Sequence, residues 1–538
     1  MKKIFAIIIA AASLTTGFTS CSDFLEEDNK TGMTADLTYN TVSGIEGLVK
    51  SCYAYTRGWW GKEAGLGLTE CGSDLFLAGF DNKQKSLTSY NLSARSLDGN
   101  TADDAVLDHY WEMFYDAIDV CNNALKYIPL NSNITDTKKE QYYGEVKFLR
   151  ALYYSQMVAT WGPIPYNTEP MSAQVTTPVR VPEATVYKNI LTDIDEAIAH
   201  FKASNFTDKA KNGGEQGRAT LYAAYALKAR VALYAASWLG NNAVEGYSNL
   251  YQIAQAAAEE VIANSGASFY SRYSDTWNMN NEAIQNNKEA IWGVAYNNDL
   301  TTENCIPYRY KTNSSGSHLS FNSLITRTGY SRGGSAMLLM FVPMWNNGNS
   351  GDVGSNGTGD DRYNNVNIGG WKSFPGLKKF LDDQYNSKYP THDISSRDAI
   401  VFRLAEMYLI KAECQLQNGG DALATLNQLR AARAISGQDN SLSGTVDINT
   451  ILDERALELC GEQQRWFDLK RTHTLVDRVK KYNGQGAGNI NAIHYYRPIP
   501  EAQMISCTNV VTAPVAQDAN GVLQYTETTD GFWQNPGY

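Results

Sequence analysis

The chain has 538 residues, enough to bury a large core, with 46 Lys and Arg against 57 Asp and Glu and a net charge of −11. This acidic balance argues against nucleic acid as a partner, because a protein that binds such a polyanion normally carries a basic surface. Aromatic residues make up 11% of the chain, with 33 Tyr and 11 Trp. They either pack in the core or form a surface that stacks on flat ligands, since Tyr and Trp combine an apolar face with a polar group.

The N-terminal stretch predicts a sorting signal followed by a tether. Lys2 and Lys3 precede an apolar run over residues 4–14, which is too short to span a bilayer as a stable anchor. Ser20 followed by Cys21 resembles a bacterial lipobox, which implies cleavage before Cys21 and acylation there. Four acidic residues follow, namely Asp23, Glu26, Glu27 and Asp28. We therefore expect a lipoprotein signal peptide at 1–20 and a lipidated acidic tether at 21–35.

Most of the next 260 residues predict helices, because apolar residues recur every three or four positions. The predicted helices cover residues 36–60, 105–129, 141–160, 186–201, 217–236 and 251–263. Trp59 and Trp60 lie between Gly58 and Gly61 at the end of the first helix. Because neighbouring side chains point in different directions, we expect at least one of these two rings to be exposed or to cover a cleft.

The middle of the chain loses this periodicity. A short strand is predicted at 289–296, and residues 297–390 are then rich in Gly, Asn, Ser and Tyr without a helical pattern. Such a long irregular stretch inside a folded chain is usually functional, so we interpret it as an inserted, irregular part of the molecule. Helical periodicity returns at 403–414 and 421–433, which predict a hairpin of two helices with a turn at 418–420.

Residues 453–471 predict one further helix with an unusual charge pattern. Glu454, Glu458 and Glu462 recur every four residues and share one face, and Arg465 follows three positions later. The charge pattern alone favours a solvated face with a few ion pairs, each stabilising the helix by about 0.2–0.5 kcal/mol.

The order of residues in this stretch resembles the C-terminal signature of the RagB/SusD family, surface lipoproteins of the Bacteroidetes that capture glycans for a TonB-dependent transporter. The resemblance rests on Glu-Arg-Ala-Leu-Glu-Leu at 454–459 and Gly-Glu-Gln-Gln-Arg-Trp-Phe-Asp-Leu-Lys-Arg at 461–471. Motifs at 147–165, at 289–296 and at both ends of the stretch 494–538 are similar to that family as well.

The resemblance implies a mostly α fold with a tetratricopeptide-like helical scaffold and a large irregular insert containing short strands. Residues 36–538 would form one domain, with the scaffold at about 36–290 and 395–475, the ligand-facing insert at about 297–390 and a C-terminal segment at 476–538. It also implies an outer-membrane protein at the cell surface, a SusC-like TonB-dependent transporter as partner, an oligosaccharide ligand, and binding without turnover or cofactor.

In that family the ligand surface comes from the loop after the first helix and from the insert. A sugar packs its apolar face on an aromatic ring and needs fixed polar partners for its hydroxyls. Carried onto this sequence, the candidate glycan-binding residues are Trp59, Trp60, Asp74, Phe76, Phe80, Asp81, Tyr90, Tyr296, Tyr308, Tyr310, Phe321 and Trp345. The paired Trp residues favour a flat platform for extended β-linked chains.

Other chemistry finds less support in the sequence. It contains no GxSxG, HExxH or GxxxxGK[ST] motif, and its six His are scattered. Asp352, Asp360 and Asp361 offer oxygen ligands for Ca²⁺, but the EF-hand spacing is absent and a flexible polar loop is favoured. A glycosidase needs two carboxyl groups roughly 5–9.5 Å apart, which a sequence alone leaves open. A surface glycoside hydrolase and a binding protein for peptides or glycopeptides are therefore the alternatives.

Overall fold

The computed structural model describes residues 34–76, 85–91, 101–207, 217–281, 283–297, 304, 359–362, 366–368, 375–380, 395–512, 516–518, 520–524 and 531–538. The predicted signal peptide and the lipidation site Cys21 lie outside these ranges. Within them, no helix has both the length and the apolar character needed to cross a bilayer.

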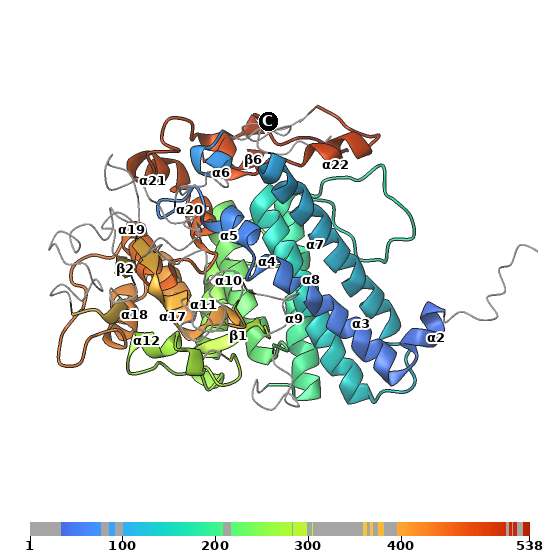
Figure 1. Ribbon diagram of the computed structural model, residues 1–538, viewed down its shortest axis with the longest axis horizontal. Coiled ribbons are helices and arrows are strands. Elements are labelled where there is room, and N and C mark those ends of the chain that lie inside the picture. Colours follow the sequence, from blue (N-terminus) through green and yellow to red (C-terminus); the bar gives the residue numbers. More distant parts are fainter. Residues whose placement is uncertain are drawn as a thin grey trace, which may run out of the picture.

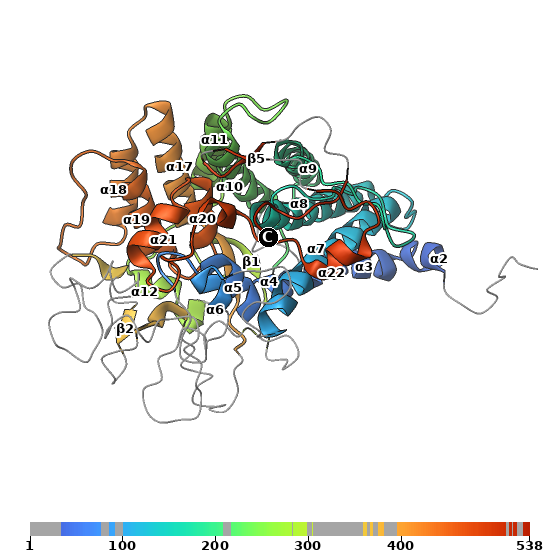
Figure 2. The ribbon, with the colours of Figure 1, turned by 90° about the horizontal axis from the view of Figure 1, so that it is seen from above.

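The protein is mostly helical, as predicted (Figure 1). Consecutive long helices pack against each other along the chain, and α11 then packs against α17 across the insert. Seen from above, α17 and α18 lie at the opposite end of the scaffold from α3 and α7 (Figure 2). The long helices are α3 (Val42–Ala54), α7 (Thr101–Tyr127), α8 (Asp136–Trp161), α9 (Glu183–Ser204), α10 (Leu221–Leu239), α11 (Leu250–Asn264), α17 (Leu404–Asn418) and α18 (Ala422–Ala431).

Shorter elements cover the ends of the long helices and the roots of the insert. The short helices are α2 (Ala35–Tyr39), α4 (Thr56–Trp59), α5 (Glu63–Glu70), α6 (Lys85–Ser89), α12 (Tyr273–Thr276), η1 (Met279–Asn281), η3 (Lys378–Phe380), α19 (Ile448–Leu459), α20 (Arg465–Arg471), α21 (Leu475–Tyr482), η4 (Ala492–Tyr495) and α22 (Glu501–Ser506). Three antiparallel strand pairs complete the described elements: β1 (Ala290–Val294) with β4 (Ala399–Arg403), β2 (Val366–Ile368) with β3 (Pro375–Leu377), and β5 (Ala516–Gln517) with β6 (Leu523–Gln524).

Two stretches predicted as single helices are divided. Residues 36–60 form α2, α3 and α4, because the Thr41 side chain accepts a hydrogen bond from Gly44 N and starts a new helix. Residues 453–471 are divided between α19 and α20, because Gly461 and Gln463 adopt φ of 75° and 61°. A left-handed backbone does not continue a right-handed helix, so the chain turns between the two.

The insert leaves and rejoins the scaffold at one place, which we call the insert neck and define as β1, β4 and the bridge between Asn304 and Ser395. Val294 lies opposite Ala399 in the antiparallel pair of β1 and β4. Beyond it, Asn304 N donates to Ser395 O at 3.1 Å and Ser395 N donates to Asn304 O at 3.0 Å. The predicted insert at 297–390 is therefore closed at its base by backbone hydrogen bonds.

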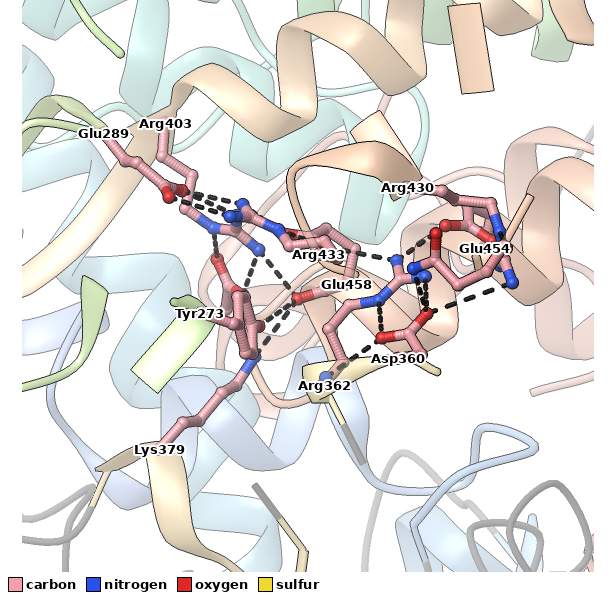
Figure 3. A network of polar contacts seen from close by, with 12 residues as sticks. Tyr273, Glu289, Asp360, Arg362, Lys379, Arg403, Arg430, Arg433, Glu454 and Glu458 are labelled. Carbon is pink, nitrogen blue, oxygen red and sulfur yellow. Dashed lines mark hydrogen bonds and ion pairs between the residues drawn. The ribbon is translucent and has the colours of Figure 1, made fainter. Parts of the chain in front are cut away.

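A buried network of ion pairs joins α19 to the insert neck, and Glu458 lies at its centre (Figure 3). Glu458 Oε1 accepts from Arg403 Nη1 at 2.6 Å and from Arg433 Nη2 at 2.8 Å, and its Oε2 accepts from Arg362 Nη1 at 3.2 Å. All four side chains are at most 1% exposed. Burial alone would raise the pKa of Glu458, but the three guanidinium groups outweigh it and hold the pKa well below its usual value.

The neighbouring carboxylates of the predicted charged face are buried too. Glu454 binds Arg362 and Arg430 at 2.6 and 2.7 Å. Glu462 binds Arg403 at 2.7 Å and also pairs with Lys379 of the insert. The prediction of a solvated face is therefore wrong, because cations from the insert, β4 and α18 converge on this helix and exclude water from it.

Two of the three aspartates considered for Ca²⁺ are occupied by other partners. Asp360 is fully buried and binds Arg362 at 2.6 Å, and Asp361 accepts a hydrogen bond from Tyr273 N at 2.9 Å. Asp352 lies outside the described residues. In the ranges given above, no group of three or more His, Cys, Asp or Glu side chains is arranged to hold a metal ion. The flexible polar loop predicted here is wrong for Asp360, which is a fixed part of the network.

We predict that Glu458→Gln destabilises the protein by about 3–5 kcal/mol, because it leaves three buried guanidinium groups without their shared carboxylate. The stabilisation from Glu458 is present above the pKa of an unfolded glutamate, about 4.3, and is lost as the pH falls toward the lower folded value. Urea unfolding at pH 7 and at pH 3 measures both effects.

Asp453→Asn is the matched control, because Asp453 is on the same helix but 52% of its side chain is exposed. We expect it to cost at most about 1 kcal/mol, as for other exposed ion pairs. Equal losses in the two variants would contradict a central role for Glu458.

Candidate functional site

Both rings of the Trp pair, of which at least one was predicted to be exposed or to cover a cleft, are buried. Trp59 is 0% exposed and Trp60 is 3% exposed. The two rings do point in different directions, but both directions lead into the protein. The Trp59 ring lies 4.8 Å from the Tyr110 ring of α7, and the Trp60 ring lies perpendicular to Trp292 of β1 at 6.3 Å. The prediction of an exposed Trp platform for β-linked chains is therefore wrong.

The glycines beside this pair allow close packing. In the sequence alone, glycines at these positions instead favour an exposed pair. A Cβ on Gly58 would lie 2.5 Å from Met113 Sδ of α7. Gly61 has φ +96°, and a Cβ there would collide with the hydroxyl of Tyr296. Both glycines are required because α4 is enclosed between α7 and the insert neck.

Tyr296 is a structural residue of the insert neck. Its ring is 5% exposed, its hydroxyl donates to Trp60 O, and its backbone N donates to Asp398 Oδ1 at 2.8 Å. Burial raises the pKa of Asp398 to about 6, although the backbone N–H groups of Tyr296 and Ile284 and the charge of Arg397 act in the opposite direction. The Tyr296 ring therefore connects the insert to α4, and it offers no face to a ligand.

Asp74 connects the loop after the first helices to the C-terminal part of the scaffold. It is 1% exposed, binds Arg465 through two hydrogen bonds of 2.7 Å, and also accepts from Arg478 Nε at 2.7 Å. Burial would raise the pKa of Asp74, but the two arginines outweigh it and lower the pKa. Its carboxylate is thus fully used inside the protein.

Phe76, which directly precedes the segment 77–84, and Tyr90, which comes after it and directly follows α6, are buried as well. Phe76 is 0% exposed, and Tyr90 is 2% exposed with its hydroxyl donating to Gly72 O at 2.5 Å. All six described candidates are thus buried and make structural contacts inside the protein, and their contact with a glycan stays a prediction. The other six, Phe80, Asp81, Tyr308, Tyr310, Phe321 and Trp345, lie outside the described residues and stay predictions.

The structure also contains hollows that the sequence did not predict. The larger has a volume of about 650 Å³ and lies between α7, the segment 165–181 and α22. A second, of about 400 Å³, adjoins the insert neck and is lined by α3, Arg57 and Trp292. Both volumes are in the range of ligand pockets, about 300–1,000 Å³. Aliphatic residues in a polar loop, such as Val175 and Val179, are the sequence signal for the larger hollow. Both residues are exposed in the structure.

Glu70 lies at the start of the segment that leads to Asp74, and it is a buried carboxyl without a cation of its own. It is 0% exposed, its Oε1 accepts from Gln464 N at 3.1 Å, and its Oε2 accepts no hydrogen bond from the residues that the structure describes. Burial raises the pKa of Glu70 to about 8, although the amides of 463–465 and the Arg465 charge oppose the rise. The folded protein therefore holds this carboxyl in its protonated form at neutral pH.

We predict that Trp59→Ala lowers the free energy of unfolding by about 3–5 kcal/mol, as for other large aromatic side chains removed from a core. Tyr225→Ala on α10, which is only partly buried, should cost much less. Thermal unfolding measures the difference. If the Trp59 variant kept its stability and lost a ligand instead, the assignment of a structural role would fail.

We further predict that Glu70→Gln removes a pH dependence of stability. The pKa of Glu70 is raised on folding, so its stabilising effect is full below the unfolded value near 4.5 and is lost as the pH rises through 8. Between these values the variant should gain on the wild type by a few kcal/mol, at about 1.4 kcal/mol per pKa unit. Urea unfolding from pH 4.5 to 9 tests this, and parallel curves for the two proteins would contradict it.

Comparison with known proteins agrees with the helical architecture and with the C-terminal motif. A model of the SusD family matches residues 341–538, and a model described as starch-binding and associating with the outer membrane matches residues 71–233. The chain is 27% identical to SusD-like protein P25 of Formosa agariphila, over 93% of this chain and 96% of the relative.

Solved structures share the fold at lower identity. A laminarin-binding SusD-like protein superposes with a TM-score of 0.67 at 20% identity, covering 92% of this chain and 99% of that one. Surface glycan-binding protein A from Bacteroides thetaiotaomicron, solved in complex with laminarihexaose, gives a TM-score of 0.64 at 17% identity, with 86% and 97% covered. These matches agree with the expected resemblance: the chain is similar to SusD-like proteins over nearly its whole length.

Proposed function

We propose that this protein binds oligosaccharides at the outer surface of the outer membrane and passes them to a SusC-like TonB-dependent transporter, without cleaving them. The observation that carries the proposal is the match over nearly the whole chain to SusD-like relatives, together with the fold shared with proteins solved as laminarin- and laminarihexaose-binding. Lipidation at Cys21 would hold the protein at the membrane, since two or three acyl chains anchor a protein where one does not.

The architecture supports a division of work within the chain. The scaffold uses its described aromatic candidates for packing, so the rings that meet a sugar come from elsewhere. The insert supplies Tyr308, Tyr310, Phe321 and Trp345, and its base is fixed by the insert neck and the Glu458 network. A rigid base limits the entropy lost when a ligand binds, which favours a shallow site carried on the insert.

The nature of the ligand is proposed from the same comparisons. Both solved relatives described above bind laminarin or a piece of it, so a β-linked glucan is the first ligand to try. The acidic chain, with a net charge of −11, favours a neutral glycan over a polyanionic one.

Affinity electrophoresis tests the proposal. Gels containing laminarin, xyloglucan or starch are run with the wild type and with Tyr308, Tyr310, Phe321 and Trp345 each changed to Ala. We expect one glycan to retard the wild type. At least two of the variants should bind it about tenfold more weakly, which corresponds to about 1.4 kcal/mol for a lost stacking contact.

Tyr225→Ala, on α10 and outside the insert, is the matched control and should bind like the wild type. Undiminished binding in all four insert variants would place the site elsewhere. New reducing ends after incubation of the wild type with the retained glycan would favour a glycoside hydrolase, and retention of a peptide pool without any glycan would favour a peptide-binding protein.

A further inference from the structure

The larger hollow, which we call the α7–α22 groove, is bordered by segments that carry most of the exposed large hydrophobic side chains of the described residues. It lies where α7, α22 and the connection from α8 to α9 meet (Figure 1). Nine large hydrophobic side chains are exposed in the described ranges, and six of them lie on the two segments that border the groove. Met171, Val175 and Val179 line the groove, while Ile505, Val510 and Val511 lie on α22 and the residues that follow it; the six exposed fractions run from 39% to 75%. Such a concentration marks an interaction surface more often than chance exposure does.

The segments that form the groove are fixed to each other. Thr508 N donates to Thr176 O at 2.7 Å, and Asn509 Nδ2 donates to Pro178 O at 2.7 Å. On the other wall, the Tyr115 hydroxyl donates to Pro165 O at 2.9 Å. The groove is therefore preformed, and a partner that enters it does not have to order these segments first.

The face of α7 that borders the groove is acidic, and Glu112 and Asp116 of this face line the groove. Asp108, Glu112, Asp116 and Asp119 follow at intervals of four, four and three residues, so they share one face of α7. Their hydrogen bonds come from neutral donors: Gln503 Nε2 reaches Asp108 and Glu112 at 3.2 and 3.3 Å. Within the described residues, none of the four forms a salt bridge.

The environment of Asp116 disfavours its charged form. Burial, and to a smaller extent the negative charge of the neighbouring Asp119, raises the pKa of Asp116. A cation beside this face would relieve the repulsion, so the wall is complementary to Lys or Arg side chains.

The chemistry of the groove distinguishes among possible occupants. A sugar needs open aromatic faces, but Trp111 and Phe532 in the lining are only 4% and 1% exposed. An anionic membrane surface would be repelled by the four carboxylates. A second copy of this chain joined through the same face would set acid against acid across a twofold axis. A protein segment with aliphatic and basic side chains satisfies both the exposed aliphatic rim and the acidic wall.

We propose that the α7–α22 groove docks an extended segment of the transporter that bears aliphatic side chains and at least one Lys or Arg. This rests on the proposed function, which supplies the transporter as partner. The aliphatic side chains of the segment cover Val175 and Ile505, and its basic side chain lies beside Glu112 and Asp116. Because the groove is formed by scaffold elements, docking there leaves the insert accessible to glycan.

The test is co-purification of the transporter with the tagged, full-length lipoprotein from detergent-solubilised outer membranes. In the double variant Val175→Asp/Ile505→Asp, and in the double variant Glu112→Lys/Asp116→Lys, we expect at least a tenfold loss of transporter per lipoprotein. Leu130→Asp is the matched control, because Leu130 is 63% exposed but lies at the end of α7 away from the groove, and it should co-purify like the wild type. Added salt should weaken the wild-type complex.

Two further measurements keep the outcomes distinct. Thermal unfolding of each variant verifies that it folds, and affinity electrophoresis should give unchanged glycan retention. If the wild type retains transporter and both double variants retain as much, the docking proposal fails while the proposed function stands. If the wild type brings down no transporter, the partner assignment fails and the docking proposal with it. A photo-crosslinker at position 175 that captures a second copy of this chain, or nothing, would also overturn the proposal.

Discussion

Burial of Glu458 among three arginines is the constraint on which the rest of the structure depends. An isolated charge in a protein interior is very costly, so each member of the cluster requires the others. Arg362 comes from the insert, Arg403 from the end of β4 and Arg433 from the end of the α17–α18 hairpin. These parts of the chain cannot separate from α19 without exposing an uncompensated charge to a dry environment, and the base of the insert is fixed as a result.

A second buried group does the same for the loop that follows the first helices. Asp74 holds Arg465 and Arg478, so this loop is connected to α20 and α21, which lie 391 and 404 residues further along the chain at these two arginines. Buried ion pairs add less stability than their Coulomb energy implies, because both partners lose their hydration. Their strict geometry instead fixes which segments lie together. Their main effect is therefore to position the base of the insert and the loop that contains Asp74.

The sequence allowed the helical scaffold to be predicted because apolar periodicity is a local property: the helices near 105–129, 141–160 and 186–201 are all present. The environment of charges and rings could not be predicted in the same way. Glu458 repeats every four residues with its neighbours whether its partner is water or an arginine from a distant segment. Trp59 and Trp60 point in different directions as expected, but only the fold decides that α7 and β1 cover the two rings. The glycines beside them would have the same positions in a tightly packed backbone as in an open turn, so they did not distinguish the two.

The carboxylates considered above are of two kinds: those paired with arginines in the interior, and those on α7 that form no salt bridge within the described residues. Glu454, Glu458 and Asp74 are paired with arginines in the interior, where an unpaired carboxylate would destabilise the fold. Within the described residues, the acids on α7 form no salt bridge and lie beside exposed aliphatic side chains. This arrangement is tolerated because water solvates the carboxylates. The scaffold would therefore keep its geometry if the residues proposed to meet a glycan were changed. A site built from the buried scaffold charges would instead lose stability with every change of specificity, because each change would leave a buried charge without its partner.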